Sequence, residues 1–216
     1  MSATRDQGFM ELTVNVPVIP ILTIERVTDA VPIAAALVAE GLILLEITLR
    51  TEQALEAVAR VTSEVPAAIV GVGSVIESAQ FAAARMAGAR FAVSPGATPE
   101  LEAAARAAKI PWLPGVQSVS EVLALRGRGC RFVKFFPAQP SGGIRFLRSI
   151  AGPIPDMLFC PTGGITLETA PAYLELPNVG CVGGSWLTPS SLVKSQNWNE
   201  IRMLAERAHR LRSIVR

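Results

Sequence analysis

The stretch LILLEITLRTEQALEAVARVT, residues 42–62, contains one complete unit of the fold. Residues 42–49 are a run of apolar and β-branched side chains typical of a buried strand, and the alanine-rich amphipathic stretch 52–62 is typical of a helix. The same order of strand and helix recurs along the chain at roughly 20 to 27 residues, about the size of one βα unit. Strict alternation of this kind predicts an α/β fold with a parallel sheet.

Eight such units can be placed on the chain. The predicted strands are residues 16–22, 42–49, 68–72, 90–94, 112–116, 131–136, 157–161 and 179–182, and the clearest helices are 31–39, 52–62, 78–87, 99–108 and 198–211. An open doubly wound sheet is the alternative, but eight units in 216 residues leave room only for the short loops of a small barrel. We therefore expect a single (β/α)8 barrel domain over residues 16–216, preceded by an N-terminal segment, residues 1–15.

Composition excludes several classes of protein. Hydrophobic residues make up 50% of the chain and charged residues 18%, which excludes a disordered chain. The net charge of +2 predicts no binding of nucleic acid or of an anionic membrane surface. The start of the chain lacks a signal sequence, and apolar runs such as 30–39 stop well before the ~20 residues of a membrane span, so we expect a cytoplasmic protein. His209 is the only histidine, and no metal or cofactor is expected.

The second predicted strand carries two charges on a face that should be apolar. Side chains alternate along a strand, so Glu46 and Arg50 share one face, whereas the other face is entirely apolar. In a barrel the first face points inward and becomes polar toward the carboxyl ends of the strands, where active sites lie. The alternative is a buried structural ion pair between Glu46 and Arg50, which would contribute little to stability.

The sixth predicted strand, within FVKFFP, contains a lysine between apolar residues. Lys134 shares its face with Phe132 and Phe136 and is one of three lysines among 20 basic residues, so an amine that can lose its proton is indicated. Desolvation and the nearby cation Arg50 should both lower its pKa, which would make it a nucleophile toward a carbonyl. A structural lysine paired with Glu46 is the alternative.

Two glycine-rich turns follow the last two predicted strands, at residues 162–164 and 183–185. In (β/α)8 enzymes, turns at these positions often present backbone N–H groups to a phosphate, and a helix N-terminus adds partial positive charge. The sequence therefore predicts a phosphate site there. Residues 71–74, GVGS, lack the third glycine of a dinucleotide-binding loop.

Seven motifs together resemble the 2-keto-3-deoxy-6-phosphogluconate (KDPG) aldolase family over nearly the whole chain. They are EITLRT (46–51), IVGVGSV (69–75), FAVSPG (91–96), PWLPGV (111–116), KFFPA (134–138), CPTGGI (160–165) and VGGSWL (182–187). The resemblance implies a homotrimer of (β/α)8 barrels in which Lys134 forms a Schiff base and Glu46 transfers protons. It also implies that Arg50 and Ser74 bind the substrate carboxylate and that Pro95 and Phe136 form the pocket wall. The residues implied around the phosphate are Thr162, Gly163, Gly164, Gly184 and Ser185.

The activity implied is that of a class I aldolase without a cofactor, which cleaves KDPG, a small phosphorylated keto acid, to pyruvate and glyceraldehyde 3-phosphate. Cleavage of 4-hydroxy-2-oxoglutarate is an alternative, and a non-catalytic phosphate-binding barrel is a more remote one. Two residues depart from the family pattern: Ser74 stands where threonine is more common, and Gln139 stands where glutamate is usual.

Overall fold

The computed structural model describes residues 7–214 and has an α/β fold whose strands all pair in parallel. The strands are β1 Val18–Leu22, β2 Leu44–Thr48, β3 Ile69–Gly73, β4 Phe91–Val93, β5 Trp112–Leu113, β6 Gly115–Val116, β7 Phe132–Phe135, β8 Leu158–Pro161 and β9 Val182–Gly184. They form a six-stranded sheet in the order β5-β4-β3-β2-β1-β9 and a three-stranded sheet in the order β6-β7-β8. The predicted α/β class with parallel strands is confirmed.

The two sheets meet at both of their edges. Pro114 alone separates β5 from β6, and proline has no N–H to continue a ladder. At the other edge, isolated parallel bridges join Phe159 to Val179 and Thr162 to Gly183, next to β8 and β9. The pairing is therefore that of two curled sheets rather than one uninterrupted eight-stranded sheet.

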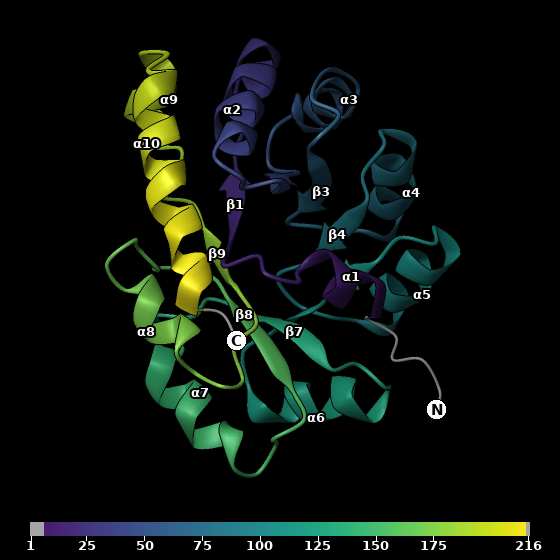
Figure 1. The fold of residues 1–216 in the computed structure, drawn as a ribbon. Coiled ribbons are helices and arrows are strands. Elements are labelled where there is room, and N and C mark those ends of the chain that lie inside the picture. Colours follow the sequence, from purple (N-terminus) through teal and green to yellow (C-terminus); the bar gives the residue numbers. More distant parts are fainter. Residues whose placement is uncertain (1–6, 215–216) are drawn as a thin grey trace.

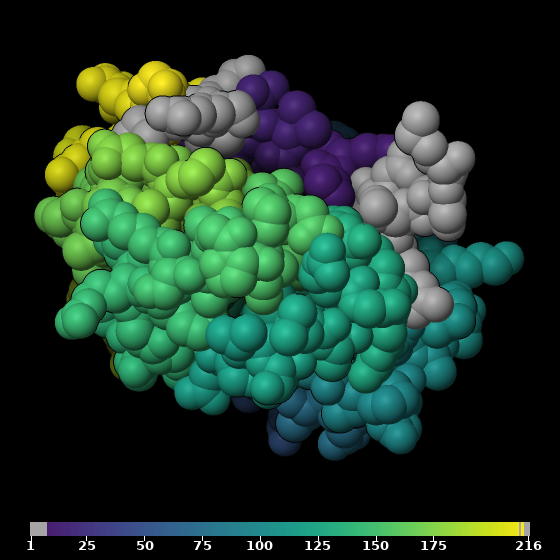
Figure 2. Space-filling view, turned by 90° about the horizontal axis from the view of Figure 1, so that it is seen from below, coloured from purple at the N-terminus to yellow at the C-terminus, as the bar shows by residue number. Residues whose placement is uncertain are grey.

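The helices lie around the outside of the strands, in the order in which they occur along the chain (Figure 1). They are α2 Val27–Ala39, α3 Ala54–Glu64, α4 Ser78–Met86, α5 Pro99–Ala107, α6 Val119–Gly127, α7 Gly143–Ala151, α8 Ala170–Leu174, α9 Ser190–Lys194 and α10 Trp198–His209, with a 3-10 turn at Arg210–Ile214. Figure 2 shows the molecule from the side on which the teal and green segments containing α6 and α7 form most of the surface.

Most predicted boundaries agree with the structure to within a few residues, and two differ for identifiable reasons. Helix α2 begins at Val27, four residues before the predicted start, because the Arg26 guanidinium binds both carboxylate oxygens of Asp29 (2.8 and 3.0 Å) and supports a polar first turn. The last strand is β9, Val182–Gly184, rather than residues 179–182. Its two glycines disfavour a strand locally, but they pair with Ile19 and Pro20 of β1.

A short helix, α1 Gln7–Leu12, supplies an aromatic side chain to the space enclosed by the strands. Phe9 is fully buried and makes edge-to-face contacts with Phe91 and Phe132, with ring centroids 5.4 and 5.6 Å away. These rings belong to an inner cluster that also contains Ile19, Leu44, Val93, Leu113, Cys160 and Cys181. Phe91 and Phe132 are the first residues of their strands, so the three packed rings lie at the amino end of the inner face.

Within residues 7–214, the helices are all too short or too polar to cross a membrane.

Candidate active site

A buried ion pair occupies the inner face just above the aromatic cluster. Lys134 on β7 donates to Glu46 on β2, with 3.4 Å between Nζ and Oε1, and the two residues are only 5% and 3% exposed. Alternation along each strand places them there, because Leu44 and Phe132, two residues earlier, belong to the inner cluster. Of the two structural alternatives that the sequence left open for Glu46, the ion pair with Lys134 is the one observed, and Arg50 bonds to Ser74 instead.

Glycine creates the space that the Glu46 carboxylate occupies. A Cβ atom on Gly73 of β3 would overlap Oε1 of Glu46, and Gly73 lies on the inner face of the neighbouring strand. Sequence reasoning missed this residue. The signal was present, since the motif GVGS places glycines at alternate positions of a strand, where they share one face.

Arg50 and Ser74, which the family resemblance implies as carboxylate-binding residues, lie together at the rim. Arg50 Nε donates to Ser74 Oγ at 2.8 Å, and the arginine is exposed at the carboxyl end of β2. Ser74 has a positive φ of 58°, a conformation that costs a non-glycine residue free energy. The strained turn directs the serine hydroxyl to the guanidinium. These two groups together can bind an anion.

The Phe136 ring and the residues paired in register with Lys134 are its neighbours besides Glu46. Nζ lies 5.3 Å from the centroid of the Phe136 ring, and Gly115, which pairs with Lys134 in register, lies against the backbone of Pro95. Cys160 is its neighbour on the other side. A hydrogen bond with Cys160, together with burial, raises the pKa of the Cys181 thiol well above its usual value, so the Cys181 sulfur remains a neutral core atom.

The two glycine-rich segments lie side by side at the carboxyl ends of β8 and β9. Thr162 bridges to Gly183, while Gly163 and Gly164 have φ values of 100° and 78°, as expected for a tight turn. Two expectations are corrected. Gly183 and Gly184 belong to β9 and not to a turn, and the short helices α8 and α9 begin only at Ala170 and Ser190, so no helix starts directly at either segment.

Comparison with known proteins identifies the family. A family model described as KDPG and KHG aldolase matches residues 10–204. The chain is 48% identical, over 89% of its length and 90% of the relative's, to 2-dehydro-3-deoxy-phosphogluconate aldolase of Dickeya dadantii. The chain belongs to the KDPG and KHG aldolase family. It is therefore an aldolase, a carbon–carbon lyase.

Two solved structures resemble this aldolase over almost its whole length. The KDPG aldolase of Zymomonas mobilis ZM4 with 3-phosphoglycerate has a TM-score of 0.90 at 44% identity and covers 99% of this chain and 100% of its own. The KDPG aldolase of Legionella pneumophila, with pyruvate captured as a covalent carbinolamine, has a TM-score of 0.87 at 44% identity and covers 95% and 98%.

Gln139, the second departure from the family pattern, supports the first glycine-rich segment of the aldolase. Its backbone N–H donates to Gly163 O at 3.0 Å, and its side-chain Oε1 accepts from the buried hydroxyl group of Tyr173 at 2.9 Å. A Cβ on Gly164 would come within 2.6 Å of Cβ of Gln139. The glutamine side chain therefore fixes the turn through packing and one neutral hydrogen bond.

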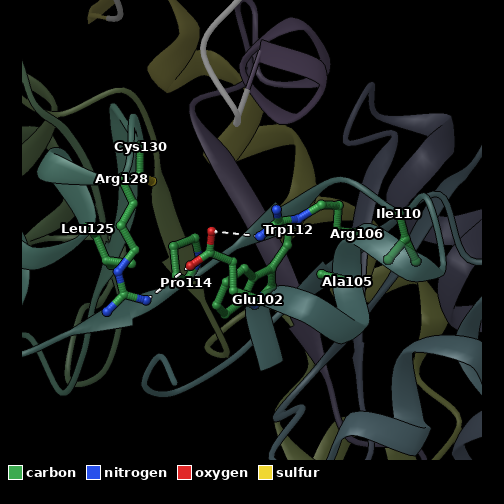
Figure 3. Close-up of a pocket in the computed structure, with 9 residues that line it drawn as sticks. All are labelled: Glu102, Ala105, Arg106, Ile110, Trp112, Pro114, Leu125, Arg128 and Cys130. Atoms are coloured by element: carbon green, nitrogen blue, oxygen red, sulfur yellow. Dashed lines mark hydrogen bonds and ion pairs between the residues drawn. The ribbon is translucent and has the colours of Figure 1, made fainter. Parts of the chain in front are cut away.

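A separate cavity of about 200 Å³ lies between α5 and α6 (Figure 3). Apolar side chains, among them Trp112 and Leu125, border it. Glu102 forms ion pairs with Arg106 on its own helix and with Arg128, which follows α6. None of the residues predicted to bind or cleave the substrate lines this cavity, and it is separate from the site around Lys134 and Glu46.

Proposed function

We propose that this aldolase cleaves KDPG to pyruvate and glyceraldehyde 3-phosphate through a Schiff base on Lys134. The observation that supports it is the buried contact of 3.4 Å between Lys134 Nζ and Glu46 Oε1, which pairs a nucleophilic amine with a group that moves protons. The covalent carbinolamine of pyruvate in the Legionella relative is the intermediate that such an amine would form.

Glu46 transfers protons in two steps, the formation of the Schiff base and the cleavage of the C3–C4 bond. The carboxylate first takes a proton from the Lys134 ammonium, and the amine adds to the C2 ketone. The resulting carboxylic acid returns the proton to the carbinolamine oxygen, which leaves as water and gives a protonated imine. The carboxylate then takes the C4 hydroxyl proton, the C3–C4 bond breaks, and its electrons pass into the imine to form an enamine. Protonation at C3 and hydrolysis release pyruvate.

The rim residues hold the two ends of the substrate. Arg50 and Ser74, already joined at 2.8 Å, bind the pyruvyl carboxylate, while Phe136 and Pro95 form the apolar wall beside Lys134. The phosphate lies against Thr162, Gly163, Gly164, Gly184 and Ser185. Backbone N–H groups supply most of the contacts, because no lysine or arginine belongs to either segment.

We also propose that the two sheets close into one barrel. The single residue between β5 and β6 and the bridges between β8 and β9 support a closed (β/α)8 barrel formed by residues 16–216, with segment 1–15 packing Phe9 into its amino end. The homotrimer and the cytoplasmic location remain predictions.

Cleavage of 4-hydroxy-2-oxoglutarate is the second candidate, because the family description includes both substrates and both share the pyruvyl half. A coupled assay of pyruvate release from the two substrates decides between them. Comparable kcat/KM values would identify a dual enzyme, whereas a strong preference for the phosphorylated substrate would support KDPG.

Borohydride trapping with pyruvate tests the Schiff base. Peptide mass mapping should find the reduced three-carbon adduct on Lys134 and on neither Lys109 nor Lys194. Label on another lysine, or inactivation without an adduct, would contradict the assignment of the Schiff base to Lys134.

A further inference from the structure

The carboxyl end of β1 carries a hydroxyl group that the reaction above does not use. Thr23 follows the last residue of β1 and is exposed. Register pairs Ile21 with Glu46 and Leu22 with Ile47, so Thr23 continues the inner face and stands opposite Thr48. The two Oγ1 atoms are 3.1 Å apart.

The direction of these hydrogen bonds leaves the Thr23 hydroxyl oxygen free to accept a hydrogen bond from a ligand. Thr48 is fully buried, and its hydroxyl donates to the backbone oxygen of Leu22 at 3.1 Å. A hydroxyl has one proton and two lone pairs, so the Thr48 proton is committed and Thr23 must donate to Thr48. The lone pairs of Thr23 Oγ1 then face the mouth of the site.

The position of β1 assigns Thr23 to one part of the substrate. In the sheet, β1 lies between β2, which carries Glu46, and β9, which leads to Ser185. Thr23, Ile21 and Ser185 border one cavity of about 150 Å³, so open space joins the hydroxyl to the phosphate end. In KDPG, C5 is the carbon between the C4 hydroxyl, on which Glu46 acts, and the phosphate ester.

We propose that Thr23 is a specificity-determining residue whose Oγ1 accepts a hydrogen bond from the C5 hydroxyl of the substrate. The inference rests on the proposed function, because it uses the orientation of KDPG between Glu46 and Ser185. Bound substrate would complete a chain from its own hydroxyl through Thr23 and Thr48 to Leu22 O, in which each bond strengthens the next. The aldolase would thus favour aldehyde phosphates that carry a hydroxyl next to the carbonyl group.

The experiment compares kcat/KM for KDPG and for its 5-deoxy analogue, which splits into pyruvate and 3-oxopropyl phosphate. The native enzyme should prefer KDPG, and Thr23→Val, which keeps the shape and removes the hydroxyl, should lower that preference by about tenfold, the effect of one hydrogen bond. Thr23→Ser retains an oxygen and should keep most of the preference.

Thr51→Val is the matched control. The Thr51 hydroxyl donates to Ile24 O at 2.7 Å and supports the same loop without a place in the proposed site, so this variant should keep the native preference. An equal loss on both substrates in Thr23→Val, or an unchanged ratio, would overturn the subsite. Borohydride labelling of Lys134 is measured in parallel: its absence from the native enzyme would refute the proposed function, whereas labelling with an unchanged ratio would refute only the role of Thr23.

Discussion

The two ends of the inner face contain opposite kinds of side chain. At the amino end, the ring of Phe9 packs edge to face against Phe91 and Phe132 within an apolar cluster. At the carboxyl end, Glu46 and Lys134 form an ion pair that is almost completely removed from water. Burial of such a pair contributes little to stability, so its place at the open end indicates function, whereas the aromatic end supplies stability.

Strand β3 shows the same division within a few residues. Gly71 and Gly73 lie on the inner face, two residues apart. A Cβ on Gly71 would overlap the Phe91 ring, and one on Gly73 would overlap the Glu46 carboxylate. The same residue type therefore makes room for a ring at one end and for a proton-transfer group at the other. Substitutions at the two ends should separate stability from activity.

The largest effect is expected at the aromatic end. Phe9→Ala removes a fully buried ring and should lower the free energy of unfolding by about 3 to 5 kcal/mol, measured by urea denaturation. Glu11→Ala changes an exposed residue of the same helix and should have a small effect. A loss below about 1 kcal/mol for Phe9→Ala would show that α1 does not contribute to the core.

The next effect is expected at the polar end. Glu46→Gln keeps the size of the side chain and should leave the fold and pyruvate binding intact, but it should lower kcat by ~10² or more because the amide cannot move protons. The measurement is kcat at saturating KDPG. A near-normal kcat would assign proton transfer to another group or to water.

The two glycines of β3 sharpen the comparison. Gly73→Ala should displace the Glu46 carboxylate and reduce kcat by about 10²-fold, because small errors in position are costly in catalysis. Gly71→Ala should instead destabilise the fold by about 1 to 3 kcal/mol through overpacking against Phe91. Unfolding and kcat are measured for both variants. Equal losses of stability and activity in the two would show that the ends are not separate.

The sequence predicted the parts of this division that depend on local pattern. The repeat of strand and helix predicted parallel strands, and alternation along residues 42–49 and 131–136 predicted the inward positions of Glu46 and Lys134. Contacts between distant segments could not be read in the same way. The sequence left both Arg50 and Lys134 open as partners of Glu46, and the choice between them depends on how the strands lie in space. The use of Gly73 and the place of Phe9 also depend on contacts between distant segments, and the pairing of Gly183 and Gly184 with β1 overrides their weak strand propensity.

The smallest expected effect concerns the phosphate end. Ser185 is exposed after β9, and Ser185→Ala removes one hydroxyl contact without changing the backbone. This change should cost about 1 to 2 kcal/mol of binding, seen as a higher KM for KDPG, with almost no effect on 4-hydroxy-2-oxoglutarate, which has no phosphate. A bulky residue at Gly163 should do more, because φ there is 100° and the Phe136 ring lies 3.4 Å from an added Cβ. Gly184 is a poorer test, since a Cβ there overlaps the Trp186 ring and disturbs packing directly. If Ser185→Ala weakens both substrates equally, the hydroxyl supports the loop and the phosphate is bound elsewhere.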